Sequence, residues 1–264
     1  MWRNSIRARI LPDSPIGPGL ACTRSSLRQK ERQALDQSGN SIPLRPVPQP
    51  LAADSLPATA LPVVETFHSL QGEGLQAGRS AFFIRLGGCA VACPWCDTKH
   101  SWPADLHPQR PLAELAGEAE AAAEAGAAFV VITGGEPLHH NLGLLCQALE
   151  PSGLPLHLET SGVDQLSGRF AWITLSPKRH HPPRTELLAA CQELKVVVHE
   201  AADLAFAAAM AVQAREARGG SPGPELLLQP GWDSPAGQTL AIDYVRHNPQ
   251  WRLSLQSHKL LGLR

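Results

Sequence analysis

Short apolar segments alternate with longer alanine-rich segments from about residue 61 to the end of the chain. The apolar segments are rich in β-branched and aromatic residues, a pattern that predicts strands. We expect these strands within residues 63–74, 80–86, 129–133, 156–160, 172–175, 193–198, 225–230 and 251–256. Helices are expected at residues 111–127, 140–150, 200–217 and 234–247, and proline or serine favours the start of the first and the last.

The alternation of strands and helices predicts an α/β fold with a parallel sheet and helices on its outside. The connection between the strands at 156–160 and 172–175 is too short to contain a full crossover helix. Every unusual polar or glycine-rich motif follows the carboxyl end of a predicted strand, where α/β proteins bind their ligands. We therefore expect an open, partial TIM-like barrel with its functional residues on one rim.

The beginning of the chain differs from the rest in composition. Residues 1–62 hold nine of the 24 prolines and carry a net charge of +4, whereas the remaining residues carry −5. We expect residues 1–60 to form a mostly disordered, proline-rich extension and residues 61–264 to form the catalytic domain. An organelle transit peptide, or a start codon placed too far upstream, would also account for this segment.

Length and composition exclude several classes of protein. A chain of 264 residues, 43% of them hydrophobic, fits one domain with a tail. The net charge of −1 gives no reason to expect nucleic-acid binding, and no run of eighteen apolar residues predicts a membrane span. The cysteine usage fits a reducing compartment, the cytoplasm. Cys22, Cys146 and Cys191 are isolated, and we expect buried or incidental thiols there.

Three cysteines, Cys89, Cys93 and Cys96, lie within eight residues in a C-x3-C-x2-C array. Disulfides do not explain them, because their number is odd and neighbouring bridges would be strained. A [4Fe-4S] cluster normally binds four cysteines, so three would leave one iron free to bind a small molecule. A structural zinc site with His100 as fourth ligand is the alternative, although no second C-x2-C pair follows.

Two motifs near the cysteines carry possible ligand contacts. The Gly-Gly-Glu sequence at 134–136 would let the backbone approach a ligand and would offer a carboxylate to an ammonium group; an ordinary strand-to-helix turn is the alternative. Thr98 offers a hard oxygen ligand that suits Mg²⁺. Alternatively, Asp97 or Thr98 caps the turn that follows.

The loop at 70–74 places an amide, Gln71, and a carboxylate, Glu73, between glycines. Such a pair could bind the amino-pyrimidinone edge of a pterin or purine, and the alternative is a simple hairpin turn. Arg85 could hold a substrate carboxylate through two hydrogen bonds, or could form an ion pair inside the barrel.

Other histidines and lysines receive no ligand role. Adjacent side chains of a strand point in opposite directions, so we expect the two His-His pairs to lie on the surface or to line loops. These pairs are His139-His140 and His180-His181. Lys99, Lys195 and Lys259 have no distinguishing context in the sequence.

The cysteine array, with the aromatic Trp95 before its last cysteine, resembles the signature of radical S-adenosylmethionine (radical SAM) enzymes. The sequences FHSLQGEG, FFIRLGGC, CDTKHSW, TGGEP, LETSG, LSPK, LQP and SLQSHKLLGLR occur in an order that resembles the 7-carboxy-7-deazaguanine synthase family. This resemblance covers about residues 61–264. It implies an incomplete radical SAM barrel, usually a homodimer.

The resemblance also implies a reaction, the conversion of 6-carboxy-5,6,7,8-tetrahydropterin to 7-carboxy-7-deazaguanine with loss of ammonia. This step serves 7-deazapurine (queuosine) biosynthesis, and so tRNA modification. The implied cofactors are a [4Fe-4S] cluster, SAM and Mg²⁺, and the implied partners are the pterin substrate and an electron donor such as a flavodoxin or ferredoxin. The radical chemistry is carried by the cofactors, so no residue is expected to act as a nucleophile.

The resemblance assigns the following residues. Cys89, Cys93 and Cys96 would bind the cluster, and Thr98 would bind Mg²⁺. The substrate contacts would be Leu70, Gln71, Gly72, Glu73, Arg85, Thr160, His258 and the terminal carboxylate of Arg264. The SAM contacts would be Gly134, Gly135, Glu136, Gly162, Ser176, Pro177, Lys178 and Gln229. Two alternatives remain: another radical SAM enzyme, such as a glycyl-radical activase, and a zinc-binding interaction module.

Overall fold

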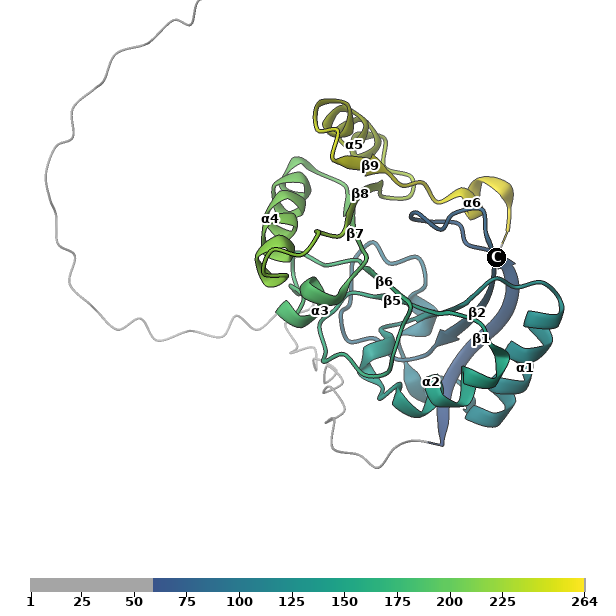
Figure 1. The fold of residues 1–264 in the computed structure, drawn as a ribbon. Helices are drawn as coiled ribbons and strands as arrows, with labels where there is room; N and C mark the ends of the chain where they lie inside the picture. Colours follow the sequence, from purple (N-terminus) through teal and green to yellow (C-terminus); the bar gives the residue numbers. More distant parts are fainter. Residues whose placement is uncertain (1–58, 264) are drawn as a thin grey trace, which may run out of the picture. The chain divides into compact units, whose positions relative to one another are not determined.

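A computed structural model of the chain describes residues 59–263 (Figure 1). The expected N-terminal extension, apart from its last two residues, lies outside this range, and so do Cys22 and Arg264. Among the described residues, no helix combines the length and the apolar character needed to cross a membrane.

Nine strands form one sheet in the described part of the chain. They are β1 (Ala60–Leu70), β2 (Ser80–Leu86), β3 (Gln109–Pro111), β4 (Val130–Gly134), β5 (Leu156–Thr160), β6 (Trp172–Leu175), β7 (Glu193–Val198), β8 (Glu225–Pro230) and β9 (Trp251–Leu253). Their order is β3-β1-β2-β4-β5-β6-β7-β8-β9. All neighbours from β2 to β9 are parallel, whereas β1 is antiparallel to β2 and to β3. The two edge strands do not pair, so the predicted open, partial barrel is confirmed.

All the helices but the last lie around the outside of the curved sheet, and the last lies beside the 70–74 loop (Figure 1). They are α1 (Leu112–Glu124), α2 (Gly143–Leu149), α3 (Thr185–Ala190), α4 (Ala201–Ala217), α5 (Pro235–His247) and α6 (Ser257–Leu261). Helices α1, α2, α4 and α5 confirm the four predicted, and the Ser234 hydroxyl caps α5 by accepting from the Gly237 N–H. The short helices α3 and α6 and the three-residue strand β3 were not expected. As predicted, no helix connects β5 to β6.

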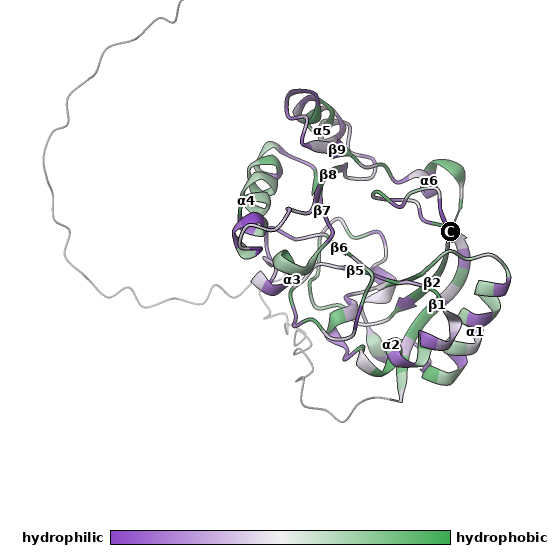
Figure 2. Cartoon of the chain, in the orientation of Figure 1, coloured by the Kyte–Doolittle hydropathy of each residue, from purple (hydrophilic) through white to green (hydrophobic). Residues whose placement is uncertain are grey.

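Alternate residues of each parallel strand face opposite sides of the sheet. The outward residues are almost all aliphatic and join the helices in the main core, as Ile84, Ile132 and Leu158 do. The inward residues become polar toward the carboxyl ends of the strands. Phe83 and Val131 belong to a small apolar cluster, whereas the next inward residues, Arg85 and Thr133, are polar. The helices carry mixed hydropathy (Figure 2), as helices with one buried face should. The barrel thus has an apolar base and a polar rim.

Candidate active site

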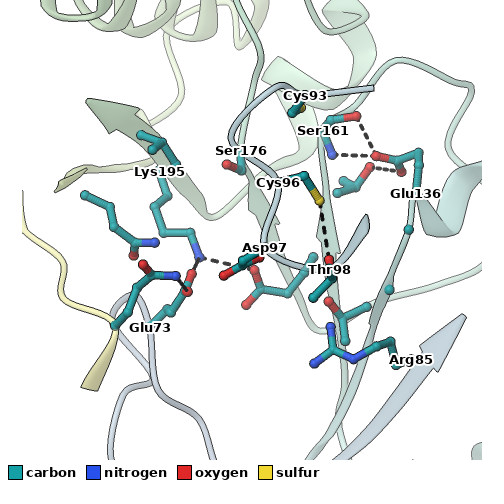
Figure 3. A pocket seen from close by; sticks show the side chains of 18 of the residues that line it. Glu73, Arg85, Cys93, Cys96, Asp97, Thr98, Glu136, Ser161, Ser176 and Lys195 are labelled. Carbon is teal, nitrogen blue, oxygen red and sulfur yellow. Dashed lines mark hydrogen bonds and ion pairs between the residues drawn. The ribbon is translucent and has the colours of Figure 1, made fainter. Parts of the chain in front are cut away.

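A cavity of about 300 Å³ opens at the carboxyl ends of the parallel strands. Most of the residues predicted as ligand contacts line it: residues 70–73, Arg85, Cys89, Cys93, Cys96, Thr98, residues 134–136, Thr160, Ser176, Lys178, Gln229 and His258. In Figure 3, Glu73 and Lys195 lie on one side of the view, and Cys93 and Cys96 on the other. The fold places these residues around one cavity, and their individual roles stay predictions.

Two of the predicted SAM contacts do not line this cavity. Gly162 turns the chain at the end of β5, with a φ of +77°, and its N–H donates to the Thr160 hydroxyl at 2.9 Å. A Cβ on Gly162 would lie 2.5 Å from Leu175 Cδ1, so the glycine is required for packing. Pro177 is also absent from the lining, between Ser176 and Lys178, which are part of it.

The cysteine loop follows β2 and is held at its base by backbone hydrogen bonds. The Cys89 N–H donates to Trp102 O at 2.9 Å, and the Cys96 N–H donates to Cys93 O at 3.1 Å. Burial raises the pKa of the Cys93 thiol, an effect that Lys178 opposes and that the neighbouring Cys89 and Cys96 reinforce. The three sulfurs therefore lie close enough to interact.

Three thiols are the donor set expected of a [4Fe-4S] cluster that keeps one iron free. Each thiolate of such a cluster binds a different iron, whereas the ligands of zinc converge on one ion. Within residues 59–263, no three His, Cys, Asp or Glu side chains form a group that could hold a single ion. Cys146 and Cys191 are buried away from the cavity, so no fourth described cysteine joins the loop. The donor set is three thiols beside an open cavity.

The two glycines of the 134–136 motif have a packing role within the fold, and their contact with a ligand stays a prediction. A Cβ on Gly135 would lie 2.2 Å from Gly88 O and 3.0 Å from Cys89 Cβ. The Glu136 N–H donates to Gly88 O at 2.8 Å. Gly135 therefore lets the segment after β4 pack directly against the cysteine loop, and Gly134 lets the end of β4 pack against Leu86 at the end of β2.

The Glu136 carboxylate is buried and accepts four hydrogen bonds. Its donors are the Leu138 N–H at 3.1 Å, the Thr160 hydroxyl at 2.5 Å, and the Ser161 N–H and hydroxyl at 2.7 and 2.5 Å. These bonds join the end of β4 to the end of β5. The Thr160 hydroxyl is thus already engaged within the protein, and so are most of the acceptor positions of Glu136.

Thr98 does not cap the turn that follows it. Its side chain makes no capping hydrogen bond to the 3-10 turn at Lys99–Ser101, and its hydroxyl lies 3.5 Å from Cys96 Sγ. Asp97 instead forms an ion pair with Lys259, whose ammonium group lies 4.9 Å from the centre of the Trp232 ring. The capping alternative is therefore wrong for the Thr98 side chain, which remains on the cavity wall.

A buried ion-pair network forms the wall opposite the cysteines. Lys195 Nζ lies 2.6 Å from Glu73 Oε2 and 3.2 Å from Glu159 Oε2, and only 3% of the Lys195 side chain is exposed. Gln256 donates to Glu73 Oε1 at 2.8 Å, and Gln71 donates to Glu159 Oε1 at 3.0 Å. Two carboxylates and two amides are thus held in place around one ammonium group.

The network changes the acidity of its members. Burial opposes ionisation of Glu73, but Lys195 and hydrogen bonds from Lys195, Gln229 and Gln256 outweigh it and lower the Glu73 pKa to about 2. Burial also opposes the charge of Lys195, yet Glu159, Glu73 and Glu193 raise its pKa above the ordinary lysine value. Glu73 and Lys195 are therefore both ionised at neutral pH.

Arg85 and His258 also line the cavity. Arg85 Nε lies 2.9 Å from Glu65 Oε1, so the predicted ion pair inside the barrel exists, while the same side chain lines the cavity. Gly72 packs directly against His258, because a Cβ at Gly72 would lie 2.2 Å from His258 Nδ1. Ser257 N–H donates to Gly72 O at 2.9 Å and fixes the C-terminal segment on the 70–74 loop.

Several residues that line the cavity were missed from the sequence. Lys195 received no role, although it lines the cavity, and Glu159 and Trp232 were not considered. A signal for the first two was present. Glu159 in LHLET and Lys195 in ELKVVV are charged residues at inward positions of their strands.

Comparisons with known proteins identify what the chain resembles. Residues 83–166 match the family model described as Radical SAM superfamily. A 7-carboxy-7-deazaguanine synthase of Prochlorococcus marinus is 54% identical over 78% of this chain and 99% of its own length. The enzyme of the same name from Escherichia coli is 32% identical over 76% and 98%. A crystal structure of QueE from Escherichia coli matches with a TM-score of 0.66 and 31% identity, over 75% of this chain and 95% of that one.

Proposed function

The chain belongs to the 7-carboxy-7-deazaguanine synthase family of radical SAM enzymes, and we propose that the cavity described above is where it carries out that family's reaction. The enzyme converts 6-carboxy-5,6,7,8-tetrahydropterin to 7-carboxy-7-deazaguanine with loss of ammonia. One observation supports this site above all: a loop with three thiols and a buried set of amides and carboxylates face one cavity. A zinc-binding module or a glycyl-radical activase is not favoured.

The cofactors of the family, a [4Fe-4S] cluster and SAM, would supply the radical that removes a hydrogen from the substrate. Cys89, Cys93 and Cys96 would hold the cluster. Backbone groups at 134–136 and the hydroxyl of Ser176 line the cavity beside it, which supports contacts with SAM there. Lys178 Nζ donates to Ser176 Oγ at 2.8 Å and so fixes the orientation of that hydroxyl.

The opposite wall would bind the pterin. Glu73 is an ionised acceptor whose position is fixed by Lys195 and Gln256, so it can accept N–H groups of an amino-pyrimidinone edge without reorganising. Gln71 is already bonded to Glu159 and to the Glu73 N–H, and would use its remaining donor or acceptor position. Arg85 would bind the substrate carboxylate through its free guanidinium nitrogens.

Mg²⁺ would bind at Thr98. The hydroxyl is not used for capping and lies on the cavity wall beside the cluster loop. Mg²⁺ keeps several waters and recruits oxygen atoms of substrates, so one protein hydroxyl can suffice as its direct protein ligand. Such an ion would orient the substrate carboxylate.

The enzyme would act in the reducing cytoplasm as a homodimer, with a flavodoxin or ferredoxin as electron donor. The family resemblance supports the dimer and the donor. Exposed Leu255, Leu260 and Leu261 offer apolar surface that could be covered in a dimer. Sedimentation of the purified protein would decide between monomer and dimer.

Binding measurements on the reconstituted protein test the two walls separately. Glu73→Gln should weaken binding of the carboxytetrahydropterin about tenfold or more and leave SAM binding unchanged, since only the substrate wall loses a charged acceptor. Ser176→Ala should weaken SAM binding and leave pterin binding unchanged. A wild-type protein that holds its cluster but binds no carboxytetrahydropterin would contradict the proposed function.

A further inference from the structure

Three histidines contact the cysteine loop, although none of them is a predicted ligand. The Ala90 N–H donates to His139 Nε2 at 2.9 Å. His140 Nε2 donates to Gly87 O at 2.8 Å, and His180 Nε2 donates to Val91 O at 3.0 Å. These contacts lie on both sides of Cys89 in the sequence, so imidazoles hold the backbone around the first predicted cluster ligand.

The orientation of His139 is fixed by a second residue. Its Nδ1 pairs with the Asp164 carboxylate, from the connection between β5 and β6. Nε2 accepts the Ala90 N–H, and Nδ1 carries a proton that it donates to the Asp164 carboxylate. A carboxylate that fixes the ring orientation of a histidine is a common arrangement around metal sites, where the histidine is itself a ligand. Here the histidine contacts the backbone at Ala90 and also the side chain of the predicted ligand Cys89.

The remaining part of the loop is held differently. Near Cys96 the Cys96 N–H donates to Cys93 O in a short turn, Asp97 forms an ion pair with Lys259, and the Trp95 ring packs against the rings of His180 and His199. An irregular loop has no ladder of backbone hydrogen bonds to fix its shape, so its backbone groups depend on partners from elsewhere. The Cys89 segment receives such partners from the segments at 137–140 and 180, which are far from it in sequence.

We propose that His139, oriented by Asp164, is a positioning residue that holds the Cys89 segment in its cluster-binding conformation before the cluster is present. His140 and His180 support the same segment at Gly87 and Val91. This inference rests on the proposed cluster-binding role of the three cysteines. It predicts that the loop is already ordered in the apoprotein and that the cluster, once bound, is retained longer because the loop does not open.

A matched pair of variants separates this role from general packing. In His139→Gln, a side-chain oxygen can reach the place of Nε2 and accept the Ala90 N–H. In His139→Asn, the shorter amide can replace Nδ1 toward Asp164 but does not reach Ala90. His181→Ala is the control, because His181 is an exposed neighbour of His180. Asp164→Ala frees the imidazole without altering a group that contacts the loop.

Hydrogen exchange of the apoprotein and chelator-driven loss of the cluster measure the effect. His139→Asn should speed exchange in peptides covering 87–95 and release the cluster about tenfold faster, the factor expected for losing one buried hydrogen bond. His139→Gln and His181→Ala should behave like wild type, and Asp164→Ala should change both measurements in the same direction by less.

Wild-type behaviour of both His139→Asn and Asp164→Ala would overturn the inference. If His139→Asn also speeds exchange throughout the strands, that variant is unfolded as a whole. The result for Asp164→Ala then tests the inference by itself. A wild-type protein that acquires no [4Fe-4S] cluster would instead refute the proposed function, and the exchange data on the apoprotein would still test the contact of His139 with the loop.

Discussion

Replacement of Lys195 by methionine tests whether the buried ion-pair network holds the substrate wall together. Methionine keeps the length and apolar stem of the side chain but removes the ammonium group. Glu73 and Glu159 would then lose the cation that lies 2.6 and 3.2 Å from their carboxylates. Removing one partner of a buried pair is more damaging than replacing both, because a charge remains without compensation.

The expected loss of stability is roughly 3 kcal/mol at neutral pH. Breaking a buried pair typically costs about 3–5 kcal/mol. The lowering of the Glu73 pKa from 4.5 to about 2 corresponds to roughly 3 kcal/mol, since each pKa unit is worth about 1.4 kcal/mol. Glu73 and Glu159 are each about one-fifth exposed, so water access places the effect at the lower end of the range.

The pH dependence of the loss follows from the direction of the shift. The low pKa of Glu73 stabilises the fold fully above its unfolded value of 4.5, and this contribution disappears as the pH falls toward about 2. In Lys195→Met, burial without the cation raises the pKa of Glu73. At low pH the Glu73 carboxylate is therefore protonated and no longer carries an uncompensated charge. The difference between wild type and variant should therefore shrink between about pH 7 and about pH 4.

Urea unfolding of the full-length apoprotein, followed by tryptophan fluorescence, gives the free energy of unfolding at each pH. Lys99→Met is the matched control, because Lys99 is exposed, and it should change stability by less than about 0.5 kcal/mol. Adding Glu73→Gln to Lys195→Met should restore part of the loss by removing one stranded charge. A loss below about 1 kcal/mol, or one that is equal at both pH values, would refute this account of the network.

Three further substitutions test other contacts. Gly72→Ala should lower kcat/KM for the pterin about 10- to 100-fold without changing SAM affinity, because its Cβ would lie 2.2 Å from His258 Nδ1; equal losses for both ligands would argue against a local effect. Gly135→Ala should cost about 1–3 kcal/mol of stability and lower the iron content after reconstitution, because its Cβ would meet Gly88 O and Cys89. Thr98→Val should abolish stimulation by Mg²⁺ and leave the Mg²⁺-free rate unchanged, and persisting stimulation would place the ion elsewhere.

The sheet could be predicted because its signal is local. Each predicted strand is a short apolar segment ended by glycine, proline or polar residues, and each lies where the structure has a strand. The last one is shorter than expected, Trp251–Leu253 in place of 251–256. Helices α3 and α6 have only six and five residues, too few for a helical repeat to be visible. The three residues of β3 become a strand through pairing with β1, a tertiary contact.

The candidate site could be predicted in its motifs but not in its internal partners. The resemblance identified many of the residues that line the cavity, yet spacing alone could not reveal that Glu136 accepts hydrogen bonds from Thr160 and Ser161. Lys195 was passed over because it was considered alone. Its role depends on its ion pairs with Glu73, 122 residues away, and with Glu159, 36 residues away. Only the folding of the sheet into a curved, partial barrel brings these three residues together.

The most direct test of the central claim is turnover. The protein is purified without oxygen, its cluster is reconstituted, and SAM, a reductant, Mg²⁺ and 6-carboxy-5,6,7,8-tetrahydropterin are added. The account predicts 7-carboxy-7-deazaguanine and ammonia in equal amounts, formed by wild type and not by a Cys93→Ser variant. An intact [4Fe-4S] cluster that cleaves SAM but forms no deazaguanine would contradict the assigned reaction.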